Sequence, residues 1–415
     1  MKKYFTIFLI YIITTLSYAQ HRGKTIFLDA FVIPTDSSAN CVIPYRIPFA
    51  NLLFKKSGMG YLSGITLNIK IVSKNNPPIY KSVTKSVIVK KYKQTLAKES
   101  YLDGVIKLHL KKGKYNVETS LLLKYQKSIV KIKKHAVNVT DTLKIYKPLV
   151  MSRVNSDCKN KTVFELYEYG KIIPFSPSPK IMLIPVSDSS VSKIKISVLQ
   201  RKKIIIKYSI INYKNKNLNI VECNDKLFVD LSNSKKYRLF LLDNIEKYFD
   251  EGRIKIIVSY GEKKSAIFHY NVLWLNKPIV LRNTEFAIKL IDKIWGKHDV
   301  TKILDLDDGK QYRALKKYLS KYDTDKSTKF NEVMNEFYKR ADYAIFNLGK
   351  NISSKNALSD MGEIYIKYGK PINKKRVFSK KNNIIEIWEY NKPRRKFVFL
   401  DKTGLGNYTL IKFKK

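Results

Sequence analysis

The side chains with the clearest capacity for acid–base chemistry lie in the C-terminal part of the chain. Five carboxylates occur there, at Asp360, Glu363, Glu386, Glu389 and Asp401. Asp360 and Glu386 could serve as a general acid and a general base if the fold brought them into one cleft. Carboxylates on a lysine-rich surface more often form ion pairs or cap turns. We therefore predict no catalytic residue and no enzymatic activity.

Aromatic side chains accompany these carboxylates. A strand through 384–390 would place Glu386 and Trp388 on the same face. Aromatic rings can stack on a sugar or anchor a protein partner, and they can equally form the core of a sheet. The sequence leaves both roles open. The tentative binding residues are Asp360, Tyr365, Tyr368, Glu386, Trp388, Tyr390, Asp401 and Tyr408.

Other motifs with known chemistry are incomplete. None of the five histidines lies at metal-ligand spacing from Cys, Asp or another His. No serine lies in a nucleophile elbow, and no glycine-rich loop has a phosphate-binding pattern. The segment 401–406 has too few acidic residues for a calcium loop, so we expect a hairpin turn there. The sequence predicts neither a metal nor a cofactor.

The chain has three cysteines, at Cys41, Cys158 and Cys223. In an oxidising compartment, one disulfide could form and one thiol would remain. Cys158 and Cys223 are the expected pair because the predicted domain boundaries place them together. Three isolated buried thiols are an equally good interpretation.

Helical spacing and strand patterns in the last third of the chain predict an α+β domain over 277–415. Apolar residues recur every three or four positions in three segments, which we expect to be helices: 284–295, 310–322 and 329–348. Four later segments have strand character and are separated by turns: 363–368, 384–390, 396–401 and 408–413. These strands should form an antiparallel meander after the helices.

The preceding residues are mainly β in character. Short runs rich in Val, Ile, Tyr and Phe recur between turn signals, which is typical of β-sandwiches. The expected strands include 25–33, 41–48, 65–71, 105–110, 115–125, 163–167, 180–186, 194–199, 204–211 and 254–260. A short helix could lie within 234–249. We predict a multi-domain, mainly β chain, with Ig-like β-sandwich domains at 20–148 and 149–276.

The first nineteen residues have the three-part pattern of a secretory signal peptide. Lys2 and Lys3 precede an apolar run from Tyr4 to Leu16, and Ser17-Tyr18-Ala19 offers a cleavage site before Gln20. The apolar run is shorter than the ~20 residues needed to span a bilayer. No cysteine near this site could carry a lipid anchor. We expect export to the periplasm, with cell-surface or outer-membrane association left open.

The charge of the chain is strongly positive, with 80 Lys and Arg against 34 Asp and Glu and a net charge of +46. Such a surface attracts polyanions, including anionic lipid and acidic glycans. The charge is spread along the chain, and no recognisable nucleic-acid module accompanies it. We therefore expect no specific nucleic-acid binding.

Several ordered motifs between Phe286 and Leu410 resemble the GWxTD domain of exported proteins in Bacteroidetes and related bacteria. The helical segment 330–344 is similar to the charged helix ahead of the family's motif. The segment 362–371, with its Tyr-Gly-x-Pro ending, resembles a family strand. The segments 386–390 and 395–408 resemble the next strand and the closing hairpin.

The naming motif of that family aligns with Asn356–Asp360, where only Asp360 keeps the family residue. If the motif is structural, Asp360 could cap the turn before Gly362. The resemblance implies an envelope protein. Our leading hypothesis is a non-enzymatic protein with an envelope protein partner, in an interaction or scaffolding role. The alternative is a glycan-binding or glycan-active protein that uses the aromatic and acidic face of the C-terminal domain.

Overall fold

The computed structural model describes most of the chain outside the N-terminus and several loops: 26–34, 38–74, 76–97, 99–140, 144–153, 164–231, 237–261, 264–348, 358–379 and 383–414. The chain divides into two compact units, Met1–Trp274 and Leu275–Lys415. Strands form 50% of the chain and helices 21%, so the fold is mainly β, as predicted. The expected signal peptide lies outside the described residues.

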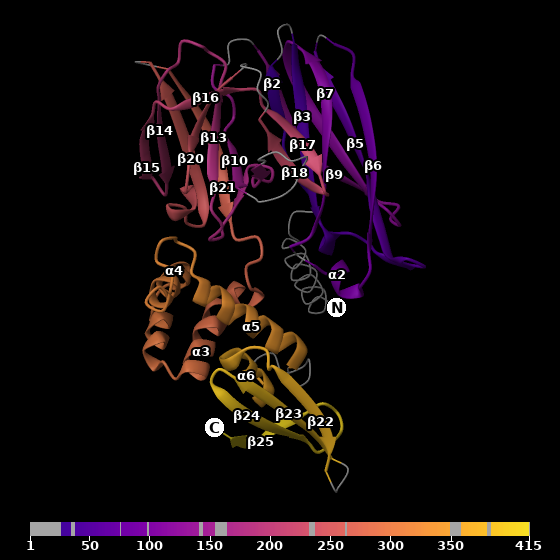
Figure 1. The fold of residues 1–415 in the computed structure, drawn as a ribbon, viewed down its shortest axis with the longest axis vertical. Helices are drawn as coiled ribbons and strands as arrows, with labels where there is room; N and C mark the ends of the chain where they lie inside the picture. The colour runs from indigo at the N-terminus through magenta and orange to yellow at the C-terminus, as the bar shows by residue number, and fades with distance from the viewer. Residues whose placement is uncertain are drawn as a thin grey trace, which may run out of the picture. The chain divides into compact units, whose positions relative to one another are not determined.

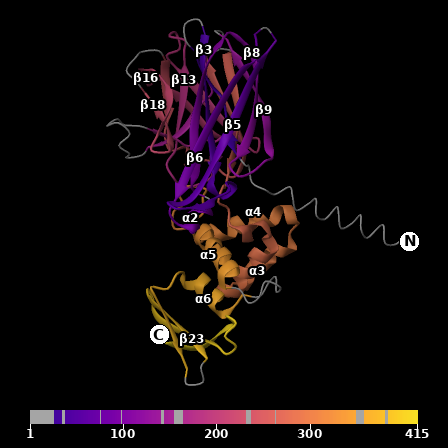
Figure 2. The same cartoon turned by 90° about the vertical axis from the view of Figure 1, so that its right-hand side faces the viewer.

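Two antiparallel sheets form the first part of the N-terminal unit (Figure 1). Sheet A contains β1 (Phe27–Leu28), β2 (Phe31–Pro34), β3 (Ser38–Pro48) and β7 (Tyr101–Lys111). Sheet B contains β4 (Lys55–Ser57), β5 (Gly60–Ser73), β6 (Ile79–Val89), β8 (Gly113–Leu123) and β9 (Ile129–Val139). Two short helical turns, η1 (Phe49–Asn51) and α2 (Tyr92–Thr95), lie between these strands. In Figure 2 the strands of sheet B face the viewer.

Two further sheets follow in the same unit. Sheet C has the strand order β16 (Tyr213–Lys216), β19 (Tyr237–Leu242), β13 (Ile181–Val186), β10 (Leu149–Arg153), β11 (Phe164–Leu166), β18 (Lys226–Asp230) and β17 (Asn219–Cys223). Sheet D has the order β12 (Ile172–Pro174), β21 (Lys264–Leu273), β20 (Gly252–Tyr260), β14 (Ile194–Gln200) and β15 (Lys203–Ile210). The turn η2 (Ile245–Lys247) follows β19.

Sheet A is buried on both faces. Alternate residues of β3, such as Cys41 and Ile43, share one apolar core with Leu67 of sheet B. On the opposite face, Phe31 and Val42 share a second core with residues of sheet C that include Met151 and Leu183. Successive side chains of a strand point to opposite faces. Because consecutive residues of β3 are apolar, each of its two faces contributes to a separate core.

Sheet C is also an internal layer. All six residues of β13 are buried, and the alternate residues Ile181 and Leu183 belong to the core shared with sheet A. The hydroxyl of Tyr270, in sheet D, donates to the carbonyl oxygen of Pro148 at 2.6 Å, next to the first residue of β10. The N-terminal unit is thus a stack of sheets in the order B, A, C, D (Figure 1). We call the contact between sheets A and C the seam.

The C-terminal unit begins with helices. They are η3 (Ile279–Arg282), α3 (Thr284–Trp295), η4 (His298–Asp305), α4 (Asp308–Leu319), α5 (Glu332–Leu348) and α6 (Asp360–Tyr368). The Asn283 side chain caps α3 by accepting from the Phe286 N–H at 2.9 Å. Gly296 ends this helix with φ of 61°, the left-handed conformation that glycine favours. The three helices expected from apolar spacing are confirmed.

An antiparallel meander, sheet E, completes this unit. Its strands are β22 (Asn373–Phe378), β23 (Ile384–Asn391), β24 (Arg394–Asp401) and β25 (Tyr408–Lys414). One face of the sheet packs with Met361 and other apolar residues of α6 in a core around Trp388 and Phe399. Strand β22 was not expected from the sequence, whereas the other three strands were.

One local prediction was wrong, and a second was right in part. The segment 363–368 is part of helix α6, not a strand, because Met361, Ile364, Tyr365 and Tyr368 have helical spacing and Ser359 caps the first turn. Within 234–249, the described residues form strand β19 and the single turn η2. The residues that suggested a helix there, Leu239 and Leu242, are buried strand residues.

The cysteine prediction stays partly open. Cys41 is a free buried thiol, and burial raises its pKa to about 12. Cys223 is disulfide-bonded. Cys158 lies outside the described residues, so its pairing with Cys223 stays a prediction. In the part of the chain that the structure describes, no helix is both long enough and apolar enough to cross a membrane.

Candidate functional site

Asp360 connects helix α6 to the edge of sheet E. It is the first residue of the helix, and its Oδ2 accepts a hydrogen bond from the Leu410 N–H of β25 at 2.7 Å. The cap expected from Asp360 is instead made by Ser359, whose Oγ accepts from the Gly362 N–H at 3.0 Å. Asn356 and Ala357, in the segment aligned with the naming motif, lie outside the described residues.

Glu386 is held by partners on its own sheet. Its Oε1 accepts from the indole N–H of Trp388 at 2.7 Å, and its Oε2 accepts from Arg376 Nη2 at 3.2 Å. The hydrogen bond to Glu386 raises the pKa of Arg376. Neither Glu386 nor Asp360 lines any of the three cavities described below. Both carboxylates therefore have structural partners rather than a shared cleft.

Asp401 organises the turn between β24 and β25. The backbone N–H groups of Thr403, Gly404 and Gly406 all donate to its carboxylate, at distances between 2.7 and 3.0 Å. Burial alone would raise the pKa of Asp401, but these hydrogen bonds outweigh it and the pKa is lowered. Gly404 and Gly406 have φ of 71° and 82°, which an L-residue adopts only with strain.

The aromatic residues of the tentative binding set pack against one another. Trp388 is 0% exposed and lies edge-on to Phe399, with ring centroids 5.0 Å apart. Tyr390 and Tyr408 are also buried, and the Tyr390 hydroxyl donates to the Gly369 carbonyl at 3.0 Å. Tyr365 and Tyr368 are half-buried against the same core. These burials favour the packing role over sugar stacking.

The opposite face of sheet E has an apolar centre. Strand pairing aligns Val377 with Ile385 and Lys375 with Ile387. On the next strand, β24, Leu400 is opposite Ile385 and Val398 is opposite Ile387. These residues alternate with the buried Trp388 and Phe399, so they point away from the core around Trp388. The apolar residues of this open face are half-buried or exposed: Val377, Ile385, Ile387, Val398 and Leu400.

Strand β22 is one of the two edges of this sheet, and β25 is the other. All six of its residues are exposed, and Phe378 at its end is 70% exposed. The strand pairs only with β23, so its outer side has no neighbouring strand among the described residues. Sequence reasoning missed it because Lys374, Lys375 and Arg376 hide the strand pattern. The adjacent strand-favouring residues Val377 and Phe378 were the weak signal available.

Sheet E has more positive than negative charge left without a partner. Glu389 pairs with Lys396 at 2.9 Å, Glu386 with Arg376, and Asp401 with backbone groups. Among the described residues, several of the remaining basic side chains form no ion pair: Lys375, Lys392, Arg394, Arg395 and Lys412. An incoming acidic group would therefore meet little competition from the sheet itself.

The seam of the N-terminal unit contains a buried pair that the sequence did not predict. The Nε of Arg46 in β3 donates to Asp103 of β7 at 2.7 Å, and the Arg46 Nη2 donates to the second carboxylate oxygen. The guanidinium lies 3.8 Å from the ring centroid of Tyr169, which follows β11. Both side chains are almost fully buried. Burial raises the pKa of Asp103, and Arg46 partly offsets this.

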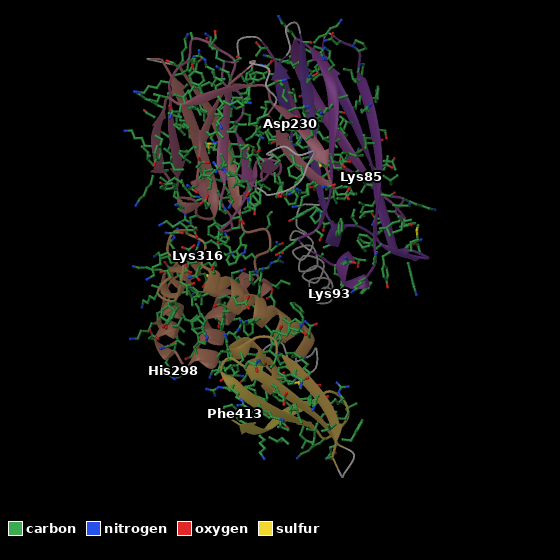
Figure 3. All side chains as sticks on the ribbon, viewed as in Figure 1. Lys85, Lys93, Asp230, His298, Lys316 and Phe413 are labelled. Atoms are coloured by element: carbon green, nitrogen blue, oxygen red, sulfur yellow. The ribbon has the colours of Figure 1, made fainter. Side chains whose placement is uncertain are left out.

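A second buried cluster lies on the same seam. Lys147 Nζ donates to Asp29 and, at 2.5 Å, to Glu168. Glu168 is 3% exposed, and burial raises its pKa to about 7 despite the nearby ammonium. At the edge of the stack, Lys85 of β6 donates to Glu222 of β17 and to the Asp103 carbonyl (Figure 3). The seam is thus held by paired charges as well as by the apolar core.

Three cavities lined by described residues are relevant to function. One of about 230 Å³ lies at the seam beside Phe31 and Tyr237, and it is mostly apolar. A second, of about 360 Å³, lies in the C-terminal unit between Trp295 and Arg340. The third, of about 850 Å³, is lined by Lys144 and Lys264. Within the described ranges, no group of three His, Cys, Asp or Glu residues could hold a metal ion.

Comparisons with known proteins give little guidance. No protein-family model matches the chain, and no curated protein matches it. Among solved structures, red sea bream transglutaminase is similar with a TM-score of 0.16 and 9% identity, covering 62% of this chain and 32% of that one. The chain thus spans about a third of the length of that protein, and a likeness this weak carries no argument about fold or function.

Proposed function

We propose that this protein is a non-enzymatic, exported cell-envelope protein in which sheet E binds an extended acidic segment of an envelope protein partner. The observation that carries this proposal is β22, an edge strand exposed along its whole length beside an open apolar face. An unpaired strand edge offers backbone N–H and C=O groups to a further strand. The resemblance of 286–410 to GWxTD domains and the pattern of residues 1–19 support the envelope location, with the periplasm as the proposed compartment.

The charges of the sheet favour an acidic partner over a second copy of the same strand. Lysines on an edge strand repel an identical strand, which is how natural sheets avoid self-association. The same lysines would attract carboxylates placed beside them. Val377 and Phe378 would supply the apolar contacts for alternate side chains of the incoming strand.

The N-terminal unit would serve as a rigid spacer. Its two outer sheets, B and D, would complete Ig-like sandwiches with A and C, and the buried charges of the seam would fix the two sandwiches to each other. The burial of Trp388 and Tyr390 supports partner binding over the glycan alternative, which requires exposed rings.

Capture of partners from crosslinked envelope fractions tests the proposal. The double variant Lys375→Glu/Val377→Glu should lose a specific acidic envelope protein that the wild type captures. The matched control is Lys203→Glu/Ile204→Glu, which makes the same change in charge and polarity on the exposed edge strand β15 of sheet D. Equal capture by the two variants, or no specific protein captured by the wild type, would contradict the proposal.

A further inference from the structure

The cleft of about 850 Å³ in the N-terminal unit has the composition of an anion site. It lies at one end of sheet D, where the connection from β13 to β14 approaches the end of β20 and the first residue of β21. This location is separate from sheet E, and the inference does not depend on the proposed partner.

The lining of the cleft is strongly positive. Its described lining residues include four lysines, Lys144, Lys193, Lys195 and Lys264, and one carboxylate, Asp188. A concave surface lined by charge of one sign concentrates the electrostatic field more than the same charges on a convex surface. The cleft therefore differs from the many scattered lysines elsewhere on the chain.

Asp188 is already used within the structure and does not neutralise the cleft. Its Oδ2 accepts from Lys144, and its Oδ1 accepts from the Ser190 N–H at 2.9 Å and the Ser190 hydroxyl at 2.6 Å. The hydrogen bond from Lys144, followed by those from Ser190, lowers the pKa of Asp188, so the carboxylate stays charged. Lys193, Lys195 and Lys264 have no ion pair with any described residue.

Neutral hydrogen-bonding groups accompany the three lysines. The hydroxyl-bearing side chains of Ser192, Ser259 and Tyr260 line the same cleft. Strand pairing places Ser259 opposite Lys195, and Tyr260 opposite Lys264, so each of these hydroxyl-bearing residues is paired with a lysine of the neighbouring strand. Lysine binds phosphate as a point charge, and hydroxyls can both donate to and accept from a sugar.

We propose that this cleft binds a phosphorylated saccharide. The phosphate groups would lie against Lys193, Lys195 and Lys264, and the sugar hydroxyls would exchange hydrogen bonds with Ser192, Ser259 and Tyr260. The volume of the cleft falls within the range of sites for small ligands, and its polar lining fits a sugar better than an apolar ligand.

Titration calorimetry on the purified full chain tests this proposal with three probes: glucose 1,6-bisphosphate, glucose and inorganic phosphate. The expected order of affinity is bisphosphate first, then inorganic phosphate, then glucose. Added NaCl should weaken the binding of the bisphosphate because exposed charges are screened. If inorganic phosphate binds as tightly as the bisphosphate, the cleft does not recognise the sugar. If glucose binds as tightly as the bisphosphate, the cleft does not recognise the phosphate groups. Either result would overturn the proposal.

A matched pair of variants tests whether the bisphosphate binds in this cleft. The triple variant Lys193→Gln/Lys195→Gln/Lys264→Gln should raise the Kd for glucose 1,6-bisphosphate about tenfold, since each exposed charge pair contributes modestly. The control triple variant Lys203→Gln/Lys207→Gln/Lys214→Gln removes the same charge from exposed positions of the same unit. It should change the Kd less than about twofold. Equal losses in both variants would show that net charge alone binds the probe and would overturn the site.

Discussion

The seam and the open face of sheet E are both surfaces of β-sheets, yet they are built differently. At the seam, charged residues are buried, and Arg46, Asp103, Lys147 and Glu168 all have partners from another strand or sheet. On sheet E, the apolar residues of the open face and the edge of β22 remain accessible, and lysines surround them. Buried paired charge at the seam belongs to a permanent contact within the protein. In the proposed function, the accessible apolar surface beside the unpaired charge of sheet E is a contact that a partner completes.

Breaking the Arg46–Asp103 pair should give the largest effect on stability. The substitution Asp103→Ala leaves the Arg46 guanidinium buried without its carboxylate, which costs about 3–5 kcal/mol. Thermal unfolding of the full chain should show a lowered Tm for the N-terminal unit. The double variant Arg46→Met/Asp103→Leu removes both charges and should be less destabilised than Asp103→Ala. If both variants unfold at the wild-type Tm, the pair does not hold the seam.

Glu168 should make the seam sensitive to pH. Its pKa in the folded chain is about 7, above its ordinary value of 4.5, so the folded state holds a proton that the unfolded state has released. This contribution to stability is complete below about pH 4.5 and is lost as the pH rises through about 7, a change of about 1–3 kcal/mol. Thermal unfolding between pH 5 and 8 measures it.

The variant Glu168→Gln provides the control for this pH dependence. Glutamine cannot ionise, so its Tm should vary less with pH over that range than the Tm of the wild type. The same slope in both proteins would assign the pH dependence to other groups.

Asp401 should contribute less than the seam residues and only to the C-terminal unit. Replacing it with Ala leaves three backbone N–H groups of the β24–β25 turn without an acceptor, a loss of about 1–3 kcal/mol. Hydrogen exchange should increase at β24 and β25 and stay unchanged at β3 and β7. Increased exchange throughout both units would show that the turn does not act locally.

The sequence predicted the parts of this fold that rest on local periodicity. Helices α3, α4 and α5 followed from apolar spacing, and about half of the described strands of the N-terminal unit followed from runs of Ile, Val and Tyr. Helix α6 was missed because its β-branched and aromatic residues also suit a strand, and its cap at Ser359 decided the outcome. Strand β22 was missed because three consecutive basic residues leave it without the apolar–polar alternation of a half-buried strand.

The seam could not be predicted because its partners are distant in sequence. Arg46 and Asp103 are separated by 57 positions, and Lys147 and Asp29 by 118, so no local pattern connects them. The candidate carboxylates were visible in the sequence, but their partners were not. Asp360 binds a backbone N–H fifty positions away, and only the structure shows that this carboxylate is engaged.

Sheet E should differ from the seam most clearly in the effect of substitutions at its exposed positions. Lys375→Glu/Val377→Glu should change the free energy of unfolding by less than about 1 kcal/mol, because both residues are exposed. Unfolding in urea checks this expectation. A loss as large as that of Asp103→Ala would mean that this edge is part of the core and is not a free surface.

Site-specific photocrosslinking in living cells tests the central claim most directly. A photoreactive phenylalanine analogue at Phe378, which is 70% exposed at the end of β22, should form an adduct with one acidic envelope protein. The same analogue at Ile204, which is 58% exposed on β15, should not form that adduct. The adduct should also disappear in the Lys375→Glu/Val377→Glu background. The same adducts from both positions, or none from Phe378, would contradict the account.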